Sequence, residues 1–347
     1  MYIKRILLII VLAGVVAAGI FSYYIYKTVF LPNTAFQNET AYVFISSDRS
    51  YAEVRNQLKD LLVDIESFDK VAQKKGYVQN VRPGKYQIKK GMNNNELVNS
   101  LRSRNIPIRI SFNNQETLKR LAGRISEQIE ADSISLLKAM KDEAYLLDNG
   151  FNSETALAMY IPNTYEFYWN SSAETFRNRM LTEYNNFWNE SRREKAAALN
   201  LSPLQVMNLA AIVQKETAMA DERPRVAGVY LNRLRIGMLL QADPTVIFAI
   251  KKETGDFDTI IRRVLFKDLE IDSPYNTYKY PGIPPGPIAM PDISSIDAVL
   301  NPEKHNFYYF VADVSRPGYH LFAQTLAQHN RNRQQYINWI NQTGINR

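Results

Sequence analysis

The longest uninterrupted hydrophobic stretch lies near the N-terminus, where Ile6–Tyr26 contains no charged residue. A helix of this length can cross the hydrocarbon core of a bilayer. Lys4 and Arg5 precede the run, and three tyrosines near its end suit a membrane interface. Because positively charged flanks stay in the cytoplasm, everything after Lys27 should lie outside. We therefore expect residues 1–30 to form a cytoplasmic tip and a single-pass transmembrane anchor.

A cleaved signal peptide is the alternative interpretation of this run, because Ala17, Ala18 and Gly19 offer small residues for cleavage. The apolar run continues past these residues, which favours a retained anchor.

A smaller domain is predicted next, over residues 42–106, after a polar and aperiodic linker at 31–41. Its order is strand, helix, helix, strand and a last helix. The segments that predict these elements are, in turn, Tyr42–Ile45, a helix opened by the Ser50–Glu53 capping box, Phe68–Lys75, Arg82–Ile88, and Asn93–Leu101.

The remaining residues, 107–347, predict a second, mainly helical domain. Ile108–Phe112 alternates as a strand does, and helical spacing follows from Leu118. Further helices are expected at Ser133–Met140, Ala173–Arg192 and Ser202–Thr217. Repeated prolines make Ser273–Pro291 a long rigid loop, and long ordered loops often carry function. The fold class is therefore α+β.

A candidate for proton transfer is Glu216, at the end of a helix that is apolar on nearly every face. Ser202 is a suitable N-cap, Pro203 suits the first helical position, and Gln205 completes a capping box. From Val206 onward such a helix must be buried. Apolar surroundings and the unpaired carbonyls of a helix C-terminus both raise the pKa of a carboxyl group, as a general acid requires. A structural network of charges would perturb an acid in the same way.

Composition narrows the chemistry further. The chain has 347 residues, a net charge of +7 and no cysteine, which excludes disulfides, thiolate zinc sites and a cysteine nucleophile. A basic balance suits an anionic membrane surface or an acidic polymer such as a cell-wall glycan with peptide carboxylates. We expect no nucleic-acid partner, because no nucleic-acid motif is present. The three histidines lack metal-ligand spacing, so we expect neither a metal nor a cofactor. No nucleophile-elbow motif supports Ser/His/Asp hydrolysis.

Several segments, in this order, resemble the YceG-like family of endolytic murein transglycosylases. They are Ala211–Thr217, Val226–Met238, Leu240–Val246, Ser273–Tyr278 and Gly282–Ala289, flanked by Tyr160–Phe167 and by Tyr309–Val311 with Gly318–His320. The resemblance covers nearly all the chain beyond the anchor.

The resemblance implies a LysM-like module followed by a catalytic domain with a lysozyme-like helical core. It implies a lyase that cleaves the MurNAc-GlcNAc bond within nascent peptidoglycan strands, forms 1,6-anhydro ends and terminates elongation. Glu216 is the implied catalytic residue. The implied substrate-binding residues are Gln241, Asp243, Thr245, Tyr275, Asn276 and Thr277. The implied location is the inner membrane, with the catalytic domain in the periplasm and penicillin-binding synthases and elongation proteins as partners.

The residues themselves leave alternatives open. Asp243 precedes a proline and is equally a turn residue, or the second carboxylate of a hydrolytic muramidase. Tyr275 and Tyr278 are either sugar contacts or loop packing. Arg233 is either a substrate ligand or the partner of Glu222. A catalytically silent glycan-binding scaffold is the alternative from another class, and the LysM-like module is either a glycan binder or a spacer.

Overall fold

The computed structural model describes residues 2–48 and 50–343 and separates into two compact units. The first unit runs to Ile110 and takes in the short segments 128–131 and 165–172; the second contains the other residues. Residue 1 and residues 344–347, at the outer ends of the predicted anchor and catalytic domain, lie outside the described part. The fold is mixed α/β, as predicted.

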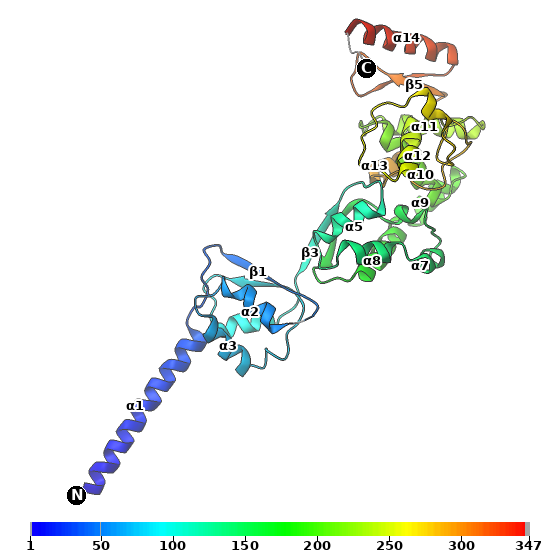
Figure 1. The fold of residues 1–347 in the computed structure, drawn as a ribbon. Helices are drawn as coiled ribbons and strands as arrows, with labels where there is room; N and C mark the ends of the chain where they lie inside the picture. Colours follow the sequence, from blue (N-terminus) through cyan, green and yellow to red (C-terminus); the bar gives the residue numbers. More distant parts are fainter. Residues whose placement is uncertain (1, 49, 344–347) are drawn as a thin grey trace. The chain divides into compact units, whose positions relative to one another are not determined.

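Helix α1 (Tyr2–Phe30, blue in Figure 1) contains the predicted hydrophobic run. Its 29 residues exceed the roughly 20 that a bilayer requires, and none of them is buried within the protein. Among the residues described, it is the one helix that is by itself long and apolar enough to cross a membrane. An N-terminal signal sequence has the same features, so both interpretations of the run stand.

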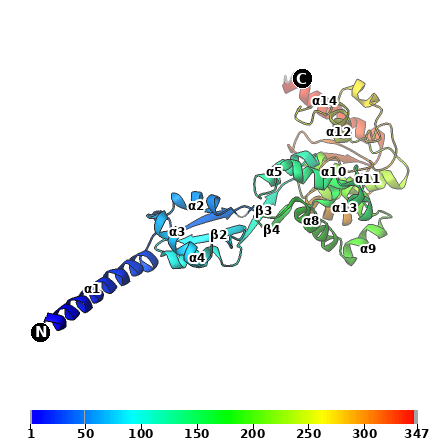
Figure 2. The same cartoon turned by 60° about the horizontal axis from the view of Figure 1, so that its bottom comes forward.

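The first unit then follows the predicted order of elements (Figures 1 and 2). The elements are β1 (Thr40–Ile45), α2 (Tyr51–Lys59), α3 (Ile65–Lys74), β2 (Gly84–Lys89) and α4 (Asn94–Leu101). β1 and β2 pair antiparallel, from Thr40 opposite Lys89 to Ile45 opposite Gly84. Alternate side chains such as Val43, Ile45, Tyr86 and Ile88 enter a core shared with α2, α3 and α4.

The caps explain where these helices begin. The Asn93–Glu96 capping box before α4 is formed as predicted. Helix α3 begins at Ile65 rather than Phe68, because the Asp64 side chain accepts a hydrogen bond from the Ser67 backbone N–H at 3.0 Å.

The segment predicted as a linker lies against the first unit. Asn33 is buried, and its amide nitrogen donates to Asn94 Oδ1 at 2.7 Å and to the Asp64 carbonyl at 2.8 Å. Asn94 in turn donates to the carbonyl of Thr28 in α1 at 2.8 Å. This buried polar network fixes the end of α1 to the rest of the first unit. The polar composition of this segment suggested a linker. The sequence does not show that the Asn33 amide finds a buried partner 61 residues away.

The second unit is mainly helical. Its elements are β3 (Pro107–Phe112), α5 (Leu118–Ser126), α6 (Ser133–Met140), α7 (Glu143–Asp148), a short 3₁₀ helix (Ala156–Met159), β4 (Asn163–Tyr168), α8 (Ala173–Phe187), α9 (Glu190–Ala198), α10 (Pro203–Glu216), α11 (Arg223–Arg235), α12 (Asp243–Thr254), a second 3₁₀ helix (Phe266–Glu270), α13 (Ile293–Leu300), β5 (Tyr309–Ala312), β6 (His320–Ala323) and α14 (Leu326–Thr343). β3 pairs with β4, β5 pairs with β6, and the unit boundary falls within β3 and β4.

One predicted helix is divided in two. The prediction of a continuous helix over Ala173–Arg192 was wrong, because α8 ends at Phe187 and α9 begins at Glu190. The Asn189 side chain accepts a hydrogen bond from the Arg192 N–H at 3.0 Å and so starts a new helix. The chain turns there around Trp188, whose side chain is almost fully buried.

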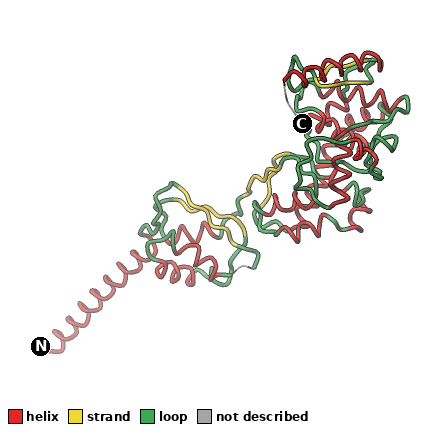
Figure 3. The backbone as a smooth tube through the Cα atoms, turned by 45° about the horizontal axis from the view of Figure 1, so that its top comes forward, coloured by secondary structure: helices red, strands yellow, loops and turns green. Residues whose placement is uncertain are grey.

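Helix α10 is the central helix of the second unit, in contact with α9, α11, α12 and α13. Every residue from Val206 to Val213 is buried, as its all-round apolar pattern predicted. The Ser202–Gln205 capping box is formed at its start. The amide of Asn208 donates to the Pro284 carbonyl at 3.0 Å, which fastens the predicted proline-rich loop against the helix. This loop contains no helix or strand between Ser273 and Pro291. Figure 3 shows that long loops, drawn in green, accompany the helices of the second unit.

Candidate functional site

Glu216 is the last residue of α10, so the buried helix places its carboxyl group where the core meets the surface. The side chain is partly exposed. Its Oε1 accepts a hydrogen bond from the hydroxyl of Tyr230 in α11 at 2.7 Å. The hydrogen bond holds the carboxyl group in one orientation, and the residue as a whole lies at the edge of the core, where a proton donor can meet a substrate.

The surroundings of Glu216 raise the pKa of its carboxyl group to about 7. The main cause is burial among apolar groups, which disfavours the charged form, and the negative charge of Asp243 acts in the same direction. The hydrogen bond from Tyr230 and the positive charge of Arg233 act against it. A carboxyl group with this pKa exchanges a proton readily near neutral pH.

Arg233 lies one turn beyond Tyr230 on α11 and links α11 to two neighbouring segments of the chain. Its Nε donates to the Tyr308 carbonyl at 2.6 Å, and its Nη1 donates to the Leu240 carbonyl at 2.5 Å. It does not pair with Glu222. That alternative was wrong, because Glu222 accepts hydrogen bonds from the backbone N–H and the Nδ1 of His320, both at 2.8 Å.

Two of the predicted substrate residues lie at the surface, and the charge of one of them, Asp243, acts on Glu216. Gln241 is exposed and has a left-handed backbone, with a φ of 47°. Asp243 is the exposed first residue of α12, and its Oδ1 accepts a hydrogen bond from the Tyr278 hydroxyl at 2.5 Å. Both side chains are accessible to a bound ligand.

The other four predicted substrate residues are buried. The hydroxyls of Thr245 and Thr277 lie 2.8 Å apart, and Thr277 also accepts from the Ala242 N–H. The Asn276 amide donates to the carbonyl of Leu269 in the second 3₁₀ helix and to the carbonyl of Ile271 just after that helix. The hydroxyl of Tyr275 donates to Glu154 at 2.7 Å. The contacts of Thr245 and Thr277 join the loop that carries Tyr278 to the segment before α12 that carries Gln241.

Sequence reasoning missed Tyr230. Within residues 2–48 and 50–343, its hydroxyl is the one group that donates a hydrogen bond to the Glu216 side chain. The available signal was weak: Tyr230 and Arg233 are three residues apart and so share a helix face. Asn232 lies on the other side of α11, where its amide donates to the carbonyls of His305 and Phe307.

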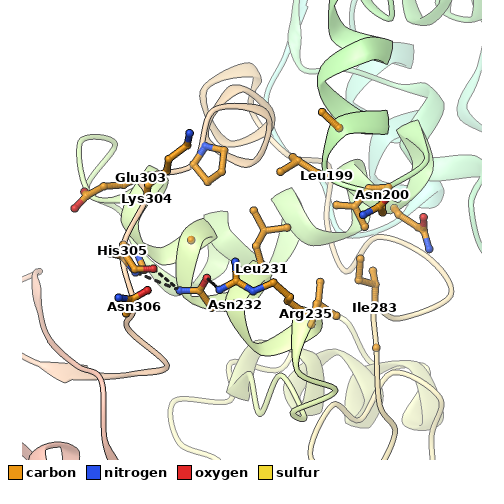
Figure 4. A pocket seen from close by; sticks show the side chains of 17 residues that line it. Leu199, Asn200, Leu231, Asn232, Arg235, Ile283, Glu303, Lys304, His305 and Asn306 are labelled. Atoms are coloured by element: carbon orange, nitrogen blue, oxygen red, sulfur yellow. Dashed lines mark hydrogen bonds between the residues drawn. The ribbon is translucent and has the colours of Figure 1, made fainter.

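A large pocket lies on that other side of α11. It measures about 910 Å³ and is lined by residues of α11, by the end of α9 and by the segment Pro302–Asn306. Figure 4 shows Leu231, Asn232 and Arg235 of α11 projecting into it, with the hydrogen bonds between Asn232 and His305. Glu216 does not line this pocket. The volume of the pocket therefore does not mark it as the catalytic site.

Comparison with known proteins identifies the class of this molecule. The sequence profile of the YceG-like family matches residues 43–335. The chain belongs to this family.

Named relatives and a solved structure agree with this assignment. The endolytic murein transglycosylase of Bacillus subtilis (strain 168) is 30% identical over 322 residues, which are 87% of this chain and 86% of that protein. The protein of the same name from Streptococcus pneumoniae strain D39 is 36% identical over 139 residues, 40% of this chain and 25% of that protein. A crystal structure of a yceG-like protein from Listeria monocytogenes superposes with a TM-score of 0.57 at 28% identity, covering 85% of this chain and 99% of that one.

Proposed function

We propose that this protein is an endolytic peptidoglycan transglycosylase, which cuts nascent glycan strands internally at the MurNAc-GlcNAc bond. The observation that carries the proposal is the partly exposed Glu216, with a pKa of about 7, held by Tyr230 at the end of a buried helix. The relatives named endolytic murein transglycosylase, similar over most of the chain, supply the substrate class.

In the proposed reaction, protonated Glu216 donates its proton to the glycosidic oxygen, and the bond from that oxygen to the muramic acid C1 breaks. The transition state is oxocarbenium-like. Glu216, now a carboxylate, takes the proton of the C6 hydroxyl, whose oxygen bonds to C1 and closes a 1,6-anhydro ring. One carboxyl group performs both proton transfers, and the substrate supplies the nucleophile at a high effective concentration.

Mass spectrometry of uncrosslinked glycan digested by the purified protein tests this function. Internal fragments with 1,6-anhydro ends are expected from the earliest times, and none from Glu216→Gln. Release of terminal disaccharides alone would refute the endolytic part, and reducing ends would refute the transglycosylase part.

A hydrolytic muramidase is the second candidate, because Asp243 is exposed and near enough to raise the pKa of Glu216. It would serve as the second carboxylate, and its products would carry reducing ends. A catalytically silent scaffold would bind glycan and release nothing.

For the location, we propose that α1 is a retained anchor in the inner membrane, with the N-terminus in the cytoplasm and both units outside. Lys4 and Arg5 before the apolar run support this orientation. A reporter enzyme fused to the C-terminus should be active only outside the cytoplasm, whereas a mature protein beginning near Gly19 would show that the helix is removed. Penicillin-binding synthases and elongation proteins are the proposed partners at that surface.

For the architecture, we propose that residues 42–106 form a LysM-like module and that α10 and its neighbours form a lysozyme-like core. The order of β1, α2, α3 and β2 supports the first, and the acid at the end of a buried helix supports the second. Binding of N-acetylglucosamine oligomers to the Glu216→Gln protein, with and without substitutions confined to this module, tests whether the module binds sugar.

A further inference from the structure

Three adjoining hollows of the second unit form a furrow, which begins at the same end of α10 as the candidate acid. The first, about 230 Å³, is lined by Lys215, the residue before Glu216. The second, about 560 Å³, shares Glu116 and Phe248 with the first. The third, about 510 Å³, shares Lys119 and Lys141 with the second. Because they share lining residues, the three hollows lie side by side.

The lining of this furrow is strongly basic. Its charged residues are the cations Lys119, Arg120, Lys138, Lys141, Lys215, Lys251 and Lys252, and the carboxylates Glu116, Glu154 and Asp258. Every carboxylate already has a cationic partner. Glu116 bonds Lys215 at 2.6 Å and Lys251 at 2.9 Å, Asp258 bonds Arg120 at 2.5 Å, and Glu154 bonds Lys252.

Three lysines remain without a counter-charge. Lys119, Lys138 and Lys141 are exposed, and their side chains make no hydrogen bond or ion pair with any residue in the described ranges. Lys138 and Lys141 lie at the C-terminus of α6, where a cation stabilises the helix. Lys119 lies in the first turn of α5, followed by Arg120, where a cation opposes the helix dipole. Helix stability therefore does not explain Lys119.

The furrow also has an apolar floor. Leu157, Phe248, Phe257 and Tyr275 line its middle hollow, and Leu137 lines its outer one. A ligand that matches both features is a short extended peptide with several carboxylates and small apolar side chains. A glycan without its peptides has hydroxyls, amides and one lactyl carboxylate on each muramic acid residue, but it lacks the additional carboxylates and the apolar side chains of the peptide.

We propose that this furrow binds the acidic stem peptides carried by the muramic acid residues of the glycan. This proposal rests on the proposed function, because that function makes the glycan the substrate. Glu216 acts on the sugar backbone while the three lysines bind the carboxylates of a peptide beside it. The protein then distinguishes peptide-bearing strands from strands whose peptides have been removed.

The test compares two glycan substrates and two triple variants of the full chain in detergent. One substrate is uncrosslinked glycan with its peptides, and the other is the same glycan after an amidase has removed them. The furrow variant is Lys119→Gln/Lys138→Gln/Lys141→Gln. The matched control, Lys195→Gln/Lys267→Gln/Lys304→Gln, removes the same charge at exposed lysines outside the furrow.

Exposed ion pairs are individually weak, so we expect the furrow variant to raise the KM for peptide-bearing glycan about tenfold. Its kcat and its KM for peptide-free glycan should not change, and the control variant should match the wild type on both substrates. Equal loss on both substrates, equal loss in both variants, or no loss at all would overturn the proposal. Preferential inhibition by a glycerol phosphate polymer over free stem peptide would instead assign the furrow to a different anionic polymer and would also overturn it.

Binding separates this proposal from the catalytic one. The same two glycans are titrated onto Glu216→Gln protein with and without the furrow substitutions. A preference of unsubstituted Glu216→Gln for peptide-bearing glycan, lost in the furrow variant, supports the furrow even if the wild type cleaves nothing. Cleavage without that preference supports the catalytic proposal alone.

Discussion

Replacement of Glu216 by glutamine tests the central physical argument, because it affects catalysis and stability through the same group. Glutamine keeps an oxygen that can accept the Tyr230 hydrogen bond, but it has no proton to donate. General acid catalysis contributes about 10²–10⁴-fold, and more where the same group also serves as the base. We therefore expect Glu216→Gln to abolish nearly all formation of anhydro ends.

The stability effect follows from the pKa. The pKa of Glu216 rises from an ordinary value of 4.5 to about 7 in the folded protein. At 1.36 kcal/mol for each pKa unit, holding the ionised group in the fold costs up to about 3 kcal/mol. Below pH 4.5 the group is protonated whether the chain is folded or unfolded, so this cost vanishes. It grows as pH rises from 4.5 to 7 and is constant above pH 7.

The assay is thermal unfolding of the wild type and Glu216→Gln at pH 4 and pH 8, with product analysis at neutral pH. The two proteins should have nearly equal Tm at pH 4. At pH 8 the variant should be more stable, by at most roughly 10 °C for a unit of this size. A difference in Tm that is the same at both pH values would show that the pKa of Glu216 is not raised. Wild-type turnover in the variant would show that Glu216 is not the acid.

Three further substitutions test neighbouring contacts. Tyr230→Phe removes a hydrogen bond that lowers the pKa of Glu216, so the alkaline limb of the rate profile should move to higher pH; an unmoved limb would contradict this role. Asp243→Asn removes a negative charge that raises this pKa, so the limb should move to lower pH and the products should keep anhydro ends; a loss as severe as that of Glu216→Gln, with reducing-end products, would favour the hydrolytic mechanism. Asn94→Ala leaves its buried partners without a hydrogen bond and should destabilise the first unit by about 1–3 kcal/mol, measured by denaturant unfolding. The rate of cleavage of soluble glycan should not change. Unchanged unfolding would mean that the network is not needed to fix α1.

Local signals in the sequence were sufficient for many of the helices. The Ser202–Gln205 and Asn93–Glu96 capping boxes bring donor and acceptor together within four residues, so they form wherever the helix forms. The prediction of one continuous helix over Ala173–Arg192 failed at Trp188 and Asn189. Trp188 is buried, and Asn189 caps a new helix, and helix propensity alone predicts neither of these.

The polar residues of the site were harder to assign. Thr245 and Thr277 are 32 residues apart, and only the folded chain shows that their hydroxyls bond each other and are buried. The segment Leu240–Val246, which carries Thr245, also carries Gln241 and Asp243, which are exposed. A motif in the sequence therefore does not separate residues that face a ligand from residues that hold the motif in shape.

The sequence by itself determined the apolar run of α1, the buried character of α10 and the position of Glu216 at its end, because each follows from the order of neighbouring side chains. Only the tertiary structure decided that Tyr230 holds Glu216, that Glu222 pairs with His320 rather than Arg233, and that Asn33 and Asn94 fix α1 to the first unit. The physical reason is that a buried polar group needs a partner, and packing chooses that partner from distant parts of the chain.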